Sequence, residues 1–518
     1  CGRCVEVCPA GAAKLGQKLC SKKAGGQVPE YPRQELPDAT KWDHTKWSPN
    51  YRNDNRIETH ESGTAPCKTA CPAHVAVQGY LKLAAQGRYD EALALIKREN
   101  PLPAICGRVC NRRCEDACTR GRVDAAVAID EVKKFIAQRD LDAATRYVPP
   151  VVTPTRAGGF DQKIAIIGAG PAGLSCAFYL AEKGYKPVVF EKNERPGGML
   201  TYGIPSFKLQ KDVIEAEVEV IRLMGAEFRY GVEVGRDVTL DELRAQGFKA
   251  FYVAIGCQGG RLASIPGEDA EDVTVAVDFL REVNSGKIDA LPGRTIVVGG
   301  GNVAIDVARN ACRLGSEHVE MFCLESEAQM PASEEERREA IEDGAHISCG
   351  WGPKEVHLDE AGSVCGITFK RCTRVYDDEG RFAPEYDEND LRRVDADRVV
   401  MSIGQSIVWG DLLAGSKVEL GRGQGALADP QTYQTAEPDI FVGGDVYTGP
   451  SFAIDAIAAG HEAAVSIHRF VQPGSTLTIG RNQRRYTALD RDDVVIESYD
   501  NASREVAHVD REREKAAP

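Results

Sequence analysis

Two glycine-rich loops, each between an apolar strand and a helix, constrain the fold of this chain more than any other feature. In the first, an apolar run from Lys163 to Ile167 leads into Gly168-Ala-Gly170-Pro-Ala-Gly173, and a helical pattern follows from Leu174 to Ala181. Glycines at this spacing allow a tight turn and let backbone N–H groups approach a pyrophosphate at the helix N-terminus. The residues predicted to contact a dinucleotide are Gly168, Gly170, Pro171, Ala172 and Gly173.

An acidic residue completes this first unit. The apolar segment Pro187-Val-Val-Phe190 predicts a second strand, and Glu191 follows it directly. In dinucleotide-binding units, an acid about 20 residues beyond the last glycine accepts hydrogen bonds from the ribose hydroxyls. Glu191 stands close to that interval after Gly173. The segment is therefore better explained as a nucleotide site than as a glycine-rich turn without a ligand.

The same order of elements occurs a second time. An apolar run from Arg294 leads into Gly299-Gly-Gly301-Asn-Val-Ala304, a helical pattern begins at Ile305, and a strand from His318 ends at Glu325. The predicted contacts of this second dinucleotide are Gly299, Gly301, Asn302, Val303 and Glu325. Two dinucleotide units in one chain indicate a hydride relay between a tightly held cofactor and an exchanging one.

The end of the second unit also predicts which nicotinamide cofactor binds. A carboxylate on the ribose 2′-hydroxyl favours NAD(H), whereas a 2′-phosphate needs an arginine. The strand ends Phe322-Cys-Leu-Glu325, and this segment contains no arginine. We therefore expect NAD(H), with NADP(H) less favoured.

Cysteines cluster near the start of the sequence, where ten of the 17 lie within the first 118 positions. The segment Cys1-Gly-Arg-Cys4-Val-Glu-Val-Cys8-Pro9 has the spacing of the last three ligands of a bacterial ferredoxin run. This spacing predicts Cys1, Cys4 and Cys8 as ligands of a [4Fe-4S] cluster. Because residue 1 lies inside the motif, we expect the sequence to begin partway through a longer polypeptide.

A second group of candidate [4Fe-4S] ligands consists of Cys67, Cys71, Cys106, Cys110, Cys114 and Cys118. The last four recur at intervals of four, which could place small core residues on one face of a helix. The polar segment Asn111-Arg-Arg113 and the two prolines Pro101 and Pro103 instead favour a chain that turns around a cluster.

Taken together, these motifs resemble the small, flavin-carrying subunit of glutamate synthase. Relatives of that subunit include the flavin region of dihydropyrimidine dehydrogenase and the large subunits of bifurcating transhydrogenases. The similarity runs from Cys67 to Val471. Besides both glycine loops it includes Asn100-Pro-Leu-Pro-Ala-Ile-Cys-Gly-Arg-Val-Cys110, Arg195-Pro-Gly-Gly198, Gly203-Ile-Pro205, Met330-Pro331-Ala332 and Gly443-Gly-Asp445.

The resemblance implies FAD in the first dinucleotide domain and further contacts to it. Gly197 and Gly198 would let the chain pass close to the cofactor, while Gly444 and Asp445 would lie on its ribityl and phosphate side. A helix opening near Ser451 would direct its positive end at the flavin ring. The implied fold is α/β, with two Rossmann-type dinucleotide-binding domains preceded by a helical iron–sulfur domain and a ferredoxin-like fragment.

Some positions depart from the family. Where NADPH-using members tend to carry paired arginines, this chain has Cys323 and Leu324, which supports NAD(H). Two cysteines of the family's first cluster are replaced by Thr59 and Ser62. A carboxylate or amide ligand of the family aligns with Lys133, which cannot bind iron while it is charged. We therefore expect one [4Fe-4S] cluster in this region, and a second one only with unusual ligands.

The domain organisation follows from these motifs and from the Pro- and Gly-rich boundaries between them. The predicted segments are a ferredoxin-like cluster fragment at 1–24, a linker at 25–62, a helical iron–sulfur domain at 63–148, an FAD domain at 160–288 and 400–472, an inserted NAD(H) domain at 289–399, and a charged C-terminal arm at 473–518.

Charge and hydropathy exclude two classes of partner. The formal net charge is -14 and the isoelectric point is about 5.3, so we expect no nucleic acid partner. Charged residues or glycines interrupt every apolar stretch before the roughly 20 residues that span a bilayer. No signal-peptide pattern opens the sequence, so we expect a cytoplasmic protein without a membrane span.

These features predict an NADH-linked flavoprotein subunit that passes electrons between NAD(H), FAD and [4Fe-4S] clusters, to or from other redox subunits, with ferredoxin as one candidate. The hydride step needs no side-chain acid or base, so no catalytic residue is assigned. The alternatives are an NADPH-dependent glutamate synthase small subunit, an electron-bifurcating flavin subunit and a non-catalytic scaffold. A dithiol reductase is excluded, because no Cys-x2-Cys or Cys-x4-Cys pair follows Cys118.

Overall fold

The computed structural model of the chain describes residues 64–122, 124–151, 159–472 and 474–478. The predicted ferredoxin-like fragment at 1–24, with Cys1, Cys4 and Cys8, lies outside the described residues. So do the linker at 25–62 and all of the C-terminal arm except 474–478. No helix in the described part of the chain is long and apolar enough to cross a membrane.

Five parallel strands form the sheet that carries the first glycine loop, in the order β15-β4-β1-β2-β3. The strands are β1 (Lys163–Ile167), β2 (Val188–Glu191), β3 (Glu227–Tyr230), β4 (Phe248–Val253) and β15 (Ile440–Val442). Parallel strands are covered on both faces, which explains why β1 and β2 are continuous apolar runs rather than alternating ones.

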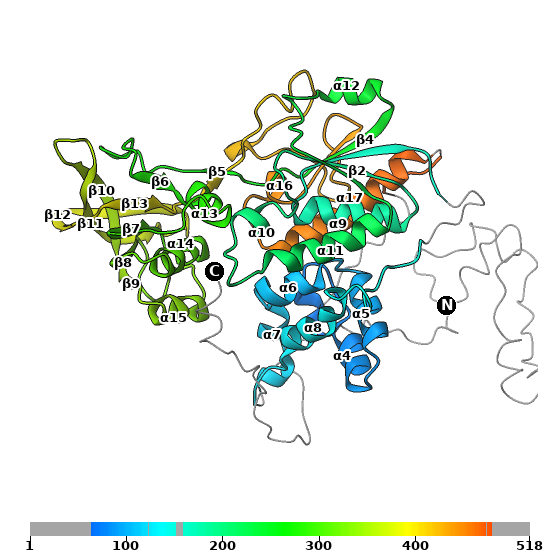
Figure 1. Cartoon of the computed structure of the whole chain (residues 1–518), viewed down its shortest axis with the longest axis horizontal. Helices are drawn as coiled ribbons and strands as arrows, with labels where there is room; N and C mark the ends of the chain where they lie inside the picture. Colours follow the sequence, from blue (N-terminus) through cyan, green and yellow to red (C-terminus); the bar gives the residue numbers. More distant parts are fainter. Residues whose placement is uncertain (1–63, 123, 152–158, 473, 479–518) are drawn as a thin grey trace, which may run out of the picture. The chain divides into compact units, whose positions relative to one another are not determined.

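Helices α9 (Pro171–Glu182) and α17 (Ala453–Val471) lie against this sheet, and α11 (Lys211–Leu223) packs on α9 (Figure 1). The same domain contains α10 (Met199–Tyr202), α12 (Leu240–Ala245), α16 (Asp445–Thr448) and the short η4 (Arg422–Gln424). Helices α9 and α17 pack closely, because Gly460 has no side chain to overlap the carbonyl of Ala172. The hydroxyl of Ser175 donates to the carbonyl of Ile457 at 2.7 Å and joins the same two helices.

A second parallel sheet carries the second glycine loop, in the order β6-β13-β7-β8-β9. Its strands are β6 (Val273–Val275), β7 (Arg294–Val298), β8 (His318–Cys323), β9 (His346–Cys349) and β13 (Arg398–Met401). The helices beside it are α13 (Ala276–Asn284), α14 (Asn302–Arg313) and α15 (Glu334–Glu342). This sheet therefore takes in a strand and a helix that precede position 289.

Two smaller sheets complete the second half of the fold. Strands β10 (Trp351–Leu358), β11 (Val364–Tyr376) and β12 (Phe382–Val394) form an antiparallel sheet. Phe369 of β11 stacks on Phe322 of β8 with 3.9 Å between ring centroids, which ties this sheet to the parallel one. Strands β5 (Gly259–Gly260) and β14 (Gln405–Ser406) pair where the chain leaves and re-enters the first domain.

The N-terminal part of the described chain is helical. It contains α3 (Pro66–Ala70), α4 (Val77–Ala85), α5 (Tyr89–Lys97), α6 (Pro103–Val109), α7 (Arg113–Asp116), η2 (Thr119–Arg122), α8 (Ile129–Ala137) and η3 (Gln138–Asp140). The prediction of two α/β dinucleotide-binding units preceded by a helical region is confirmed.

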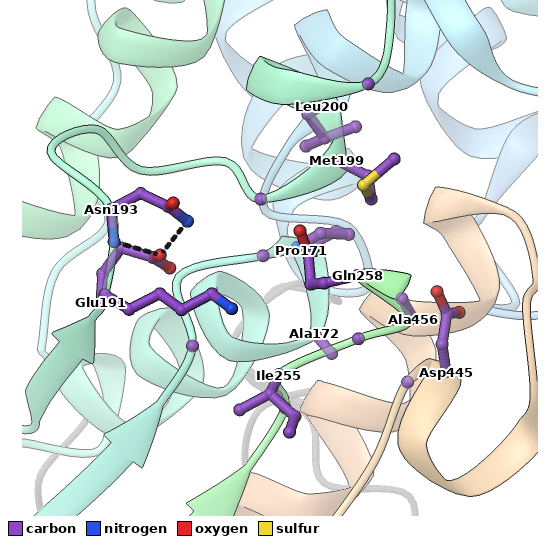
Figure 2. A pocket seen from close by; sticks show the side chains of 18 of the residues that line it. Pro171, Ala172, Glu191, Asn193, Met199, Leu200, Ile255, Gln258, Asp445 and Ala456 are labelled. Atoms are coloured by element: carbon purple, nitrogen blue, oxygen red, sulfur yellow. Dashed lines mark hydrogen bonds between the residues drawn. The ribbon is translucent and has the colours of Figure 1, made fainter. Parts of the chain in front are cut away.

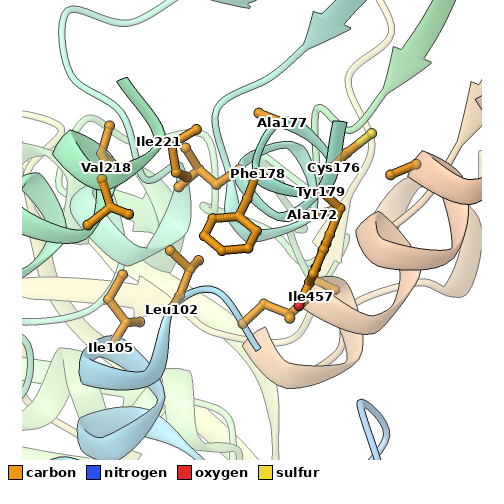
Figure 3. Close-up of a cluster of buried hydrophobic side chains, with 14 of the residues drawn as sticks. Leu102, Ile105, Ala172, Cys176, Ala177, Phe178, Tyr179, Val218, Ile221 and Ile457 are labelled. Carbon is orange, nitrogen blue, oxygen red and sulfur yellow. The ribbon is translucent and has the colours of Figure 1, made fainter. Parts of the chain in front are cut away.

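The helical domain shares one hydrophobic core with the first α/β domain (Figure 3). Leu102 and Ile105 of the helical domain lie in this core with Phe178 of α9, Ile221 of α11 and Ile457 of α17. Each is almost entirely buried, and burial of an apolar side chain of this size contributes about 1.5–3 kcal/mol. The two domains are therefore joined by core packing.

A buried carboxylate, that of Glu217, also links the first α/β domain to the helical domain. Glu217 of α11 accepts hydrogen bonds from the backbone N–H groups of Ala104 and Ile105, at 2.7 and 2.9 Å. These groups belong to the first turn of α6, where N–H donors have no partner within the helix. Burial, and then the charge of Asp140, raise the pKa of Glu217 to about 8 despite the two donors.

This raised pKa predicts a pH-dependent stability. The pKa of Glu217 is about 4.5 in the unfolded chain and about 8 in the folded protein. At a pH between these two values, Glu217 is protonated in the folded protein and ionised in the unfolded chain. The free energy of unfolding therefore falls as the pH rises, by about 1.4 kcal/mol per pH unit. We expect Glu217→Gln to gain about 2 kcal/mol over the wild type between pH 6 and pH 8, measured by urea unfolding.

The matched control is Glu215→Gln on the same helix, because the Glu215 side chain is 35% exposed and pairs with Arg222 at 3.5 Å on the surface. Its stability should follow that of the wild type at every pH. Parallel pH profiles for Glu217→Gln and the wild type would contradict the raised pKa.

Candidate functional site

A cavity of about 260 Å³ lies at the carboxyl ends of β1 and β2, and the first glycine loop forms one of its walls. Gly168 has φ +103°, and a Cβ there would lie 2.5 Å from the carbonyl oxygen of Ala254. A Cβ on Gly173 would overlap the carbonyl oxygen of Gly168. A Cβ on Gly170, in contrast, would meet no atom within 4 Å. The loop is therefore packed against backbone atoms at Gly168 and Gly173 and is open at Gly170. A pyrophosphate needs such an open position to approach the backbone.

Two carboxylates lie at opposite ends of this loop region, with Pro171 and Ala172 between them (Figure 2). The buried Glu191 accepts a hydrogen bond from the backbone N–H of Ala169 at 2.8 Å. Its other oxygen accepts bonds from the backbone and side-chain amides of Asn193, at 2.9 and 2.6 Å. These bonds hold the Glu191 carboxylate at the end of β2, where a ribose is expected.

Asp445 is held in a similar way on the other side. Its Oδ1 accepts hydrogen bonds from the backbone N–H and the hydroxyl of Ser451, both at 3.2 Å. Burial raises the pKa of Asp445, and the bonds from Ser451 oppose that rise. Both side chains line the cavity, so polar groups of a bound molecule could meet Asp445 on this side.

Two helix N-termini also face the cavity. Helix α9 begins after Gly170 with Pro171 in its first turn, and α17 begins after Phe452. No described side chain caps either helix, so their first N–H groups remain available as donors. Helices of this length carry a partial positive charge at the N-terminus, which favours anionic ligand groups.

The remaining residues predicted for FAD lie around the same loop. The N–H of Gly197 donates to the carbonyl of Ala169 at 2.8 Å, and a Cβ on Gly198 would lie 3.1 Å from the Cα of Gly170. The residues that line the cavity include Gly198, Gly444 and the loop residues Gly168, Gly170, Pro171 and Ala172, whereas Gly173 and Gly197 do not line it. The residues present therefore fit a dinucleotide in this position.

The second glycine loop repeats this geometry. Gly299 has φ +142°, and a Cβ there would overlap the carbonyl oxygen of Ser402. A Cβ on Gly301 would meet no atom within 4 Å, as at Gly170. A Cβ on Gly300 would lie 3.0 Å from Oε2 of Glu325, so this carboxylate lies over the loop. The second unit offers the same kind of cradle for a pyrophosphate and a ribose.

Residues of the second unit reach the first cavity. Val303 and Asp306 of α14, together with Leu280 of α13, line the same cavity as the first glycine loop. Gly299, Gly301, Asn302 and Glu325 do not line it. The start of α14 therefore lies between the two loops, and a molecule extending from the second loop along α14 would reach the first.

Asp306 is fixed by a lysine from the first domain. Lys208, between α10 and α11, pairs with Asp306 at 2.5 Å and also with Glu336 of α15. Burial raises the pKa of Asp306 to about 6, and Lys208 opposes that rise. The neighbouring Phe207 lies under the guanidinium of Arg313, 4.0 Å from the ring centroid. These contacts join the segment between α10 and α11 to α14 and α15.

Sequence reasoning missed Lys208, Asp306 and Asn193. Asp306 falls in the predicted second helix, one turn after the glycine loop, which is the only local signal for it. Its partner Lys208 belongs to a different domain and carries no motif. Asn193 follows Glu191 closely, and an amide at that position can bond the carboxylate.

The cysteines of the helical domain divide into two groups. Cys67 and Cys118 line one cavity of about 180 Å³, together with apolar residues such as Leu81 and Ile129. Burial raises the pKa of the Cys67 thiol, and the nearby Cys118 raises it further. Thr59 and Ser62, which replace cysteines of the family's first cluster, lie outside the described residues.

The second group consists of Cys71, Cys110 and Cys114, which do not lie along one helix. Cys110 and Cys114 lie near Lys133, and Cys71 lies near both of them. Helix α6 ends at Val109, Cys110 is extended with φ -73° and ψ 140°, and Arg112 is left-handed with φ 53°. The chain therefore turns between Cys110 and Cys114. Burial raises the pKa of Cys114 to about 12, while Lys133 lowers it and the neighbouring Cys110 and Cys71 raise it. Cys106 is fully buried in the core next to this group.

Lys133 is buried and pairs with Asp130. Burial alone would lower the pKa of Lys133, but Asp130 and then Cys110 outweigh it, and the net direction is upward. A lysine held in its charged form has no lone pair for iron. Among the described residues, no three His, Cys, Asp or Glu side chains are close enough to hold a single metal ion. A [4Fe-4S] cluster instead binds one thiolate at each iron, and Cys71, Cys110 and Cys114, which lie close enough to affect one another's pKa, stay predicted ligands of such a cluster.

Comparison with known families gives two matches. The pyridine nucleotide-disulphide oxidoreductase family matches residues 162–460. The family described as dihydropyrimidine dehydrogenase domain II, 4Fe-4S cluster, matches residues 58–145. The first match covers both glycine loops, and the second covers both groups of cysteines in the helical domain.

Individual proteins are similar over most of the chain. The NADP(+)-dependent formate dehydrogenase subunit beta of Moorella thermoacetica is 36% identical over 80% of this chain and 61% of its own length. The glutamate synthase [NADPH] small chain of Escherichia coli is 35% identical over 79% of this chain and 89% of its own length. Among solved structures, FprA of Mycobacterium tuberculosis in complex with NADPH has a TM-score of 0.51 and 20% identity, over 60% of this chain and 84% of FprA, which indicates a shared fold.

Proposed function

This chain belongs to the pyridine nucleotide-disulphide oxidoreductase family, and we propose that it is an NADH-linked subunit passing electrons between NAD(H), FAD and [4Fe-4S] clusters, to or from a partner subunit. Membership of this family makes it an oxidoreductase that uses FAD and a nicotinamide nucleotide. The second family match assigns a [4Fe-4S] cluster to the helical domain.

The shared cavity is the observation that carries the proposal. When bound, the two cofactors would supply hydride transfer between the nicotinamide and the flavin, which requires that both rings be held in one place. The first loop and the N-terminus of α9 bind a pyrophosphate, and Glu191 accepts bonds from a ribose. Val303 and Asp306 of the second unit line the same space and orient a second molecule against the first.

A contact between the cysteine segment and α17 supports electron transfer to the helical domain. Arg113, which lies between Cys110 and Cys114, donates two hydrogen bonds to Asp455 of α17 at 2.9 and 3.0 Å. Its guanidinium also lies 5.4 Å from the ring centroid of Phe452, which lines the cavity. The proposed route therefore runs from the cavity, past the start of α17, to the group around Cys110.

The proposed preference for NADH rests on the end of β8. Leu324 and Glu325 directly follow the last residue of β8, and the Glu325 carboxylate lies over Gly300, where we propose that the ribose binds. Arg371 is close to Gly350, but it pairs with Asp390 at 3.1 Å and stacks on Trp351 at 3.9 Å. It is therefore already engaged. The names of the two relatives include NADP(+) and NADPH. We propose that this chain differs from them in its nicotinamide nucleotide.

This preference predicts the effect of a new arginine. We expect Leu324→Arg to raise kcat/KM for NADPH relative to NADH by roughly 10- to 150-fold, because a charged hydrogen bond to the 2′-phosphate contributes about 1.5–3 kcal/mol. Initial rates of anaerobic flavin reduction with each nucleotide measure the ratio. Leu358→Arg, at the opposite end of β10 from Trp351 and 41% exposed, is the control and should leave the ratio unchanged. An unchanged ratio in Leu324→Arg would contradict the assignment of this strand end.

The partner is proposed by class, as another redox subunit, with ferredoxin as one candidate. The names of the relatives describe a subunit and a small chain, which supports a role inside a larger assembly. We place the protein in the cytoplasm, with NADH as its donor or product. A non-catalytic scaffold would not explain the two open glycine loops or the carboxylates of Glu191 and Asp445 that line the cavity.

Anaerobic titration tests the proposal. The purified protein, with its iron and flavin contents measured, is titrated first with NADH and then with NADPH, while flavin absorbance and the cluster EPR signal are followed on one sample. We expect NADH to bleach the flavin and to produce the EPR signal of a reduced cluster. Bleaching by NADPH alone would overturn the nicotinamide assignment, and a protein inert to both nucleotides would favour the scaffold.

A further inference from the structure

Two thiols form a close pair at the end of the second parallel sheet. Cys323 is the last residue of β8 and Cys349 the last residue of β9, and the two face each other in the strand register. Their sulfur atoms are 3.7 Å apart. Both are free thiols in the structure. This pair is not used by the proposed electron transfer.

The strand geometry allows these thiols to join. Neighbouring strands lie about 4.7–4.9 Å apart, which falls inside the Cα separation of about 4.4–6.8 Å found across disulfides. The sulfurs must approach from 3.7 Å to about 2.05 Å. Rotation of the two side chains toward each other supplies most of that movement. A disulfide could therefore form while β8 and β9 stay paired.

The pair lies directly against the proposed nicotinamide nucleotide site. A Cβ built on Gly300 would lie 2.8 Å from the Cβ of Cys323 and 3.0 Å from Oε2 of Glu325. The Cys323 thiol donates to the carbonyl of Glu325 at 3.6 Å, and the N–H of Gly350 donates to the same carbonyl at 3.0 Å. Both thiols therefore flank the backbone that carries the ribose-binding acid.

We propose that Cys323 and Cys349 form a reversible disulfide by exchange with a low-molecular-weight disulfide such as oxidised glutathione, and that the disulfide weakens nucleotide binding at the second glycine loop. The effect on nucleotide binding rests on the function proposed above, while the bond itself does not. The site is thus a thiol modification site that reports on the thiol–disulfide balance around the protein.

The exchange takes place in two steps that balance. Cys349 is only partly buried, so its thiolate attacks the small disulfide, forms a mixed disulfide and releases one thiol. The Cys323 thiolate then displaces the second small thiol and closes the Cys323–Cys349 bond. Two protein thiols are oxidised and one small disulfide is reduced to two thiols. Cys323 is the buried partner, and burial raises its pKa, which suits the resolving role better than the attacking one.

Formation of this bond changes the contacts of Glu325. The Cys323 side chain rotates toward Cys349, so its sulfur no longer donates to the Glu325 carbonyl. That carbonyl loses one of the two hydrogen bonds described above, and the Glu325 carboxylate is held less firmly over Gly300 and the bound ribose. We expect the affinity for NADH to fall about tenfold, as for a weakened hydrogen bond to a charged group.

The test uses the full-length flavoprotein under anaerobic conditions. The protein is incubated with oxidised glutathione, the reagent is removed, and peptide mass mapping determines whether Cys323 and Cys349 are joined. NADH affinity is then measured from the concentration dependence of flavin bleaching. We expect a joined peptide pair, a dissociation constant about tenfold higher, and recovery of both with dithiothreitol.

Variants separate this pair from other thiols. Cys349→Ser should form no internal bond, and its NADH affinity should be the same before and after treatment. Cys323→Ser should also form no internal bond and should stop at the mixed disulfide on Cys349, which separates closure of the bond from modification of Cys349 alone. Cys365→Ser, which removes a partly buried thiol on β11 outside the pair, should respond to oxidised glutathione as the wild type does. Comparing each variant with its own untreated sample removes any effect of the substitution itself.

Three outcomes would overturn the proposal: no Cys323–Cys349 bond after complete treatment, a mixed disulfide at Cys349 that never closes, or a closed bond with unchanged NADH affinity. A reduced wild type that NADH does not bleach would refute the proposed function instead, and the peptide map would still decide whether the bond forms.

Discussion

Gly170→Val is expected to yield a folded protein that has lost most of its flavin. Gly170 has φ -74° and ψ 178°, which valine readily adopts, and a Cβ there meets no atom within 4 Å. The valine side chain instead fills the open side of the first loop, where the pyrophosphate must approach the backbone. Overfilling a packed site costs about 1–3 kcal/mol, which is roughly 5- to 150-fold in affinity. Flavin absorbance of the purified protein and titration with FAD measure this loss.

Gly170 is chosen because substitutions at the other two glycines of the loop would disturb folding as well as binding. A side chain on Gly168 or Gly173 would run into the backbone of the loop itself or of the residue after β4. Circular dichroism should therefore remain the same for Gly170→Val as for the wild type. A yellow Gly170→Val protein with unchanged FAD affinity would show that this loop does not hold the flavin.

Gly301→Val is expected to keep its flavin and lose its response to NADH. Gly301 holds the equivalent place in the second loop, with φ -91°, ψ 174° and no atom within 4 Å of a Cβ. Valine there obstructs the second pyrophosphate and leaves the first loop intact. The NADH concentration needed for half-maximal bleaching should rise roughly 5- to 150-fold. Anaerobic flavin reduction over a range of NADH concentrations measures this shift.

The two valine variants control for each other, since they make the same change at matched positions. Dithionite should bleach Gly301→Val as fully as the wild type, because a chemical reductant does not need the second loop. If Gly301→Val lost flavin, or if it kept the wild-type response to NADH, the assignment of the two loops to different cofactors would be wrong.

Much of the fold could be predicted from sequence because each dinucleotide unit is encoded locally. The run from Lys163 to Gly173 specifies a buried strand, a turn that only glycine can make at Gly168, and a helix start at Pro171. The same holds for Gly299 in the second unit. The antiparallel sheet of β10, β11 and β12 was not predicted, although the partial alternation of buried and exposed residues in β11 carries a signal for it.

Features that depend on packing between distant segments could not be predicted. Lys208 and Asp306 form an ion pair across two domains, and neither residue lies in a motif that names the other. Glu217 meets the start of α6 only because the helical domain packs on α11. Cys323 and Cys349 are adjacent because β8 and β9 are neighbours with this register. A linear pattern records the composition of each segment but not the pairing between them.

We have proposed that two dinucleotides meet in one cavity of this chain and exchange a hydride there. The most direct measurement is anaerobic rapid mixing of the FAD-loaded protein with NADH and with NADH deuterated at C4, followed by flavin absorbance. We expect a single bleaching step that saturates with nucleotide concentration and is slower with the deuterated cofactor. A flavin that stays oxidised with both NADH and NADPH would contradict it.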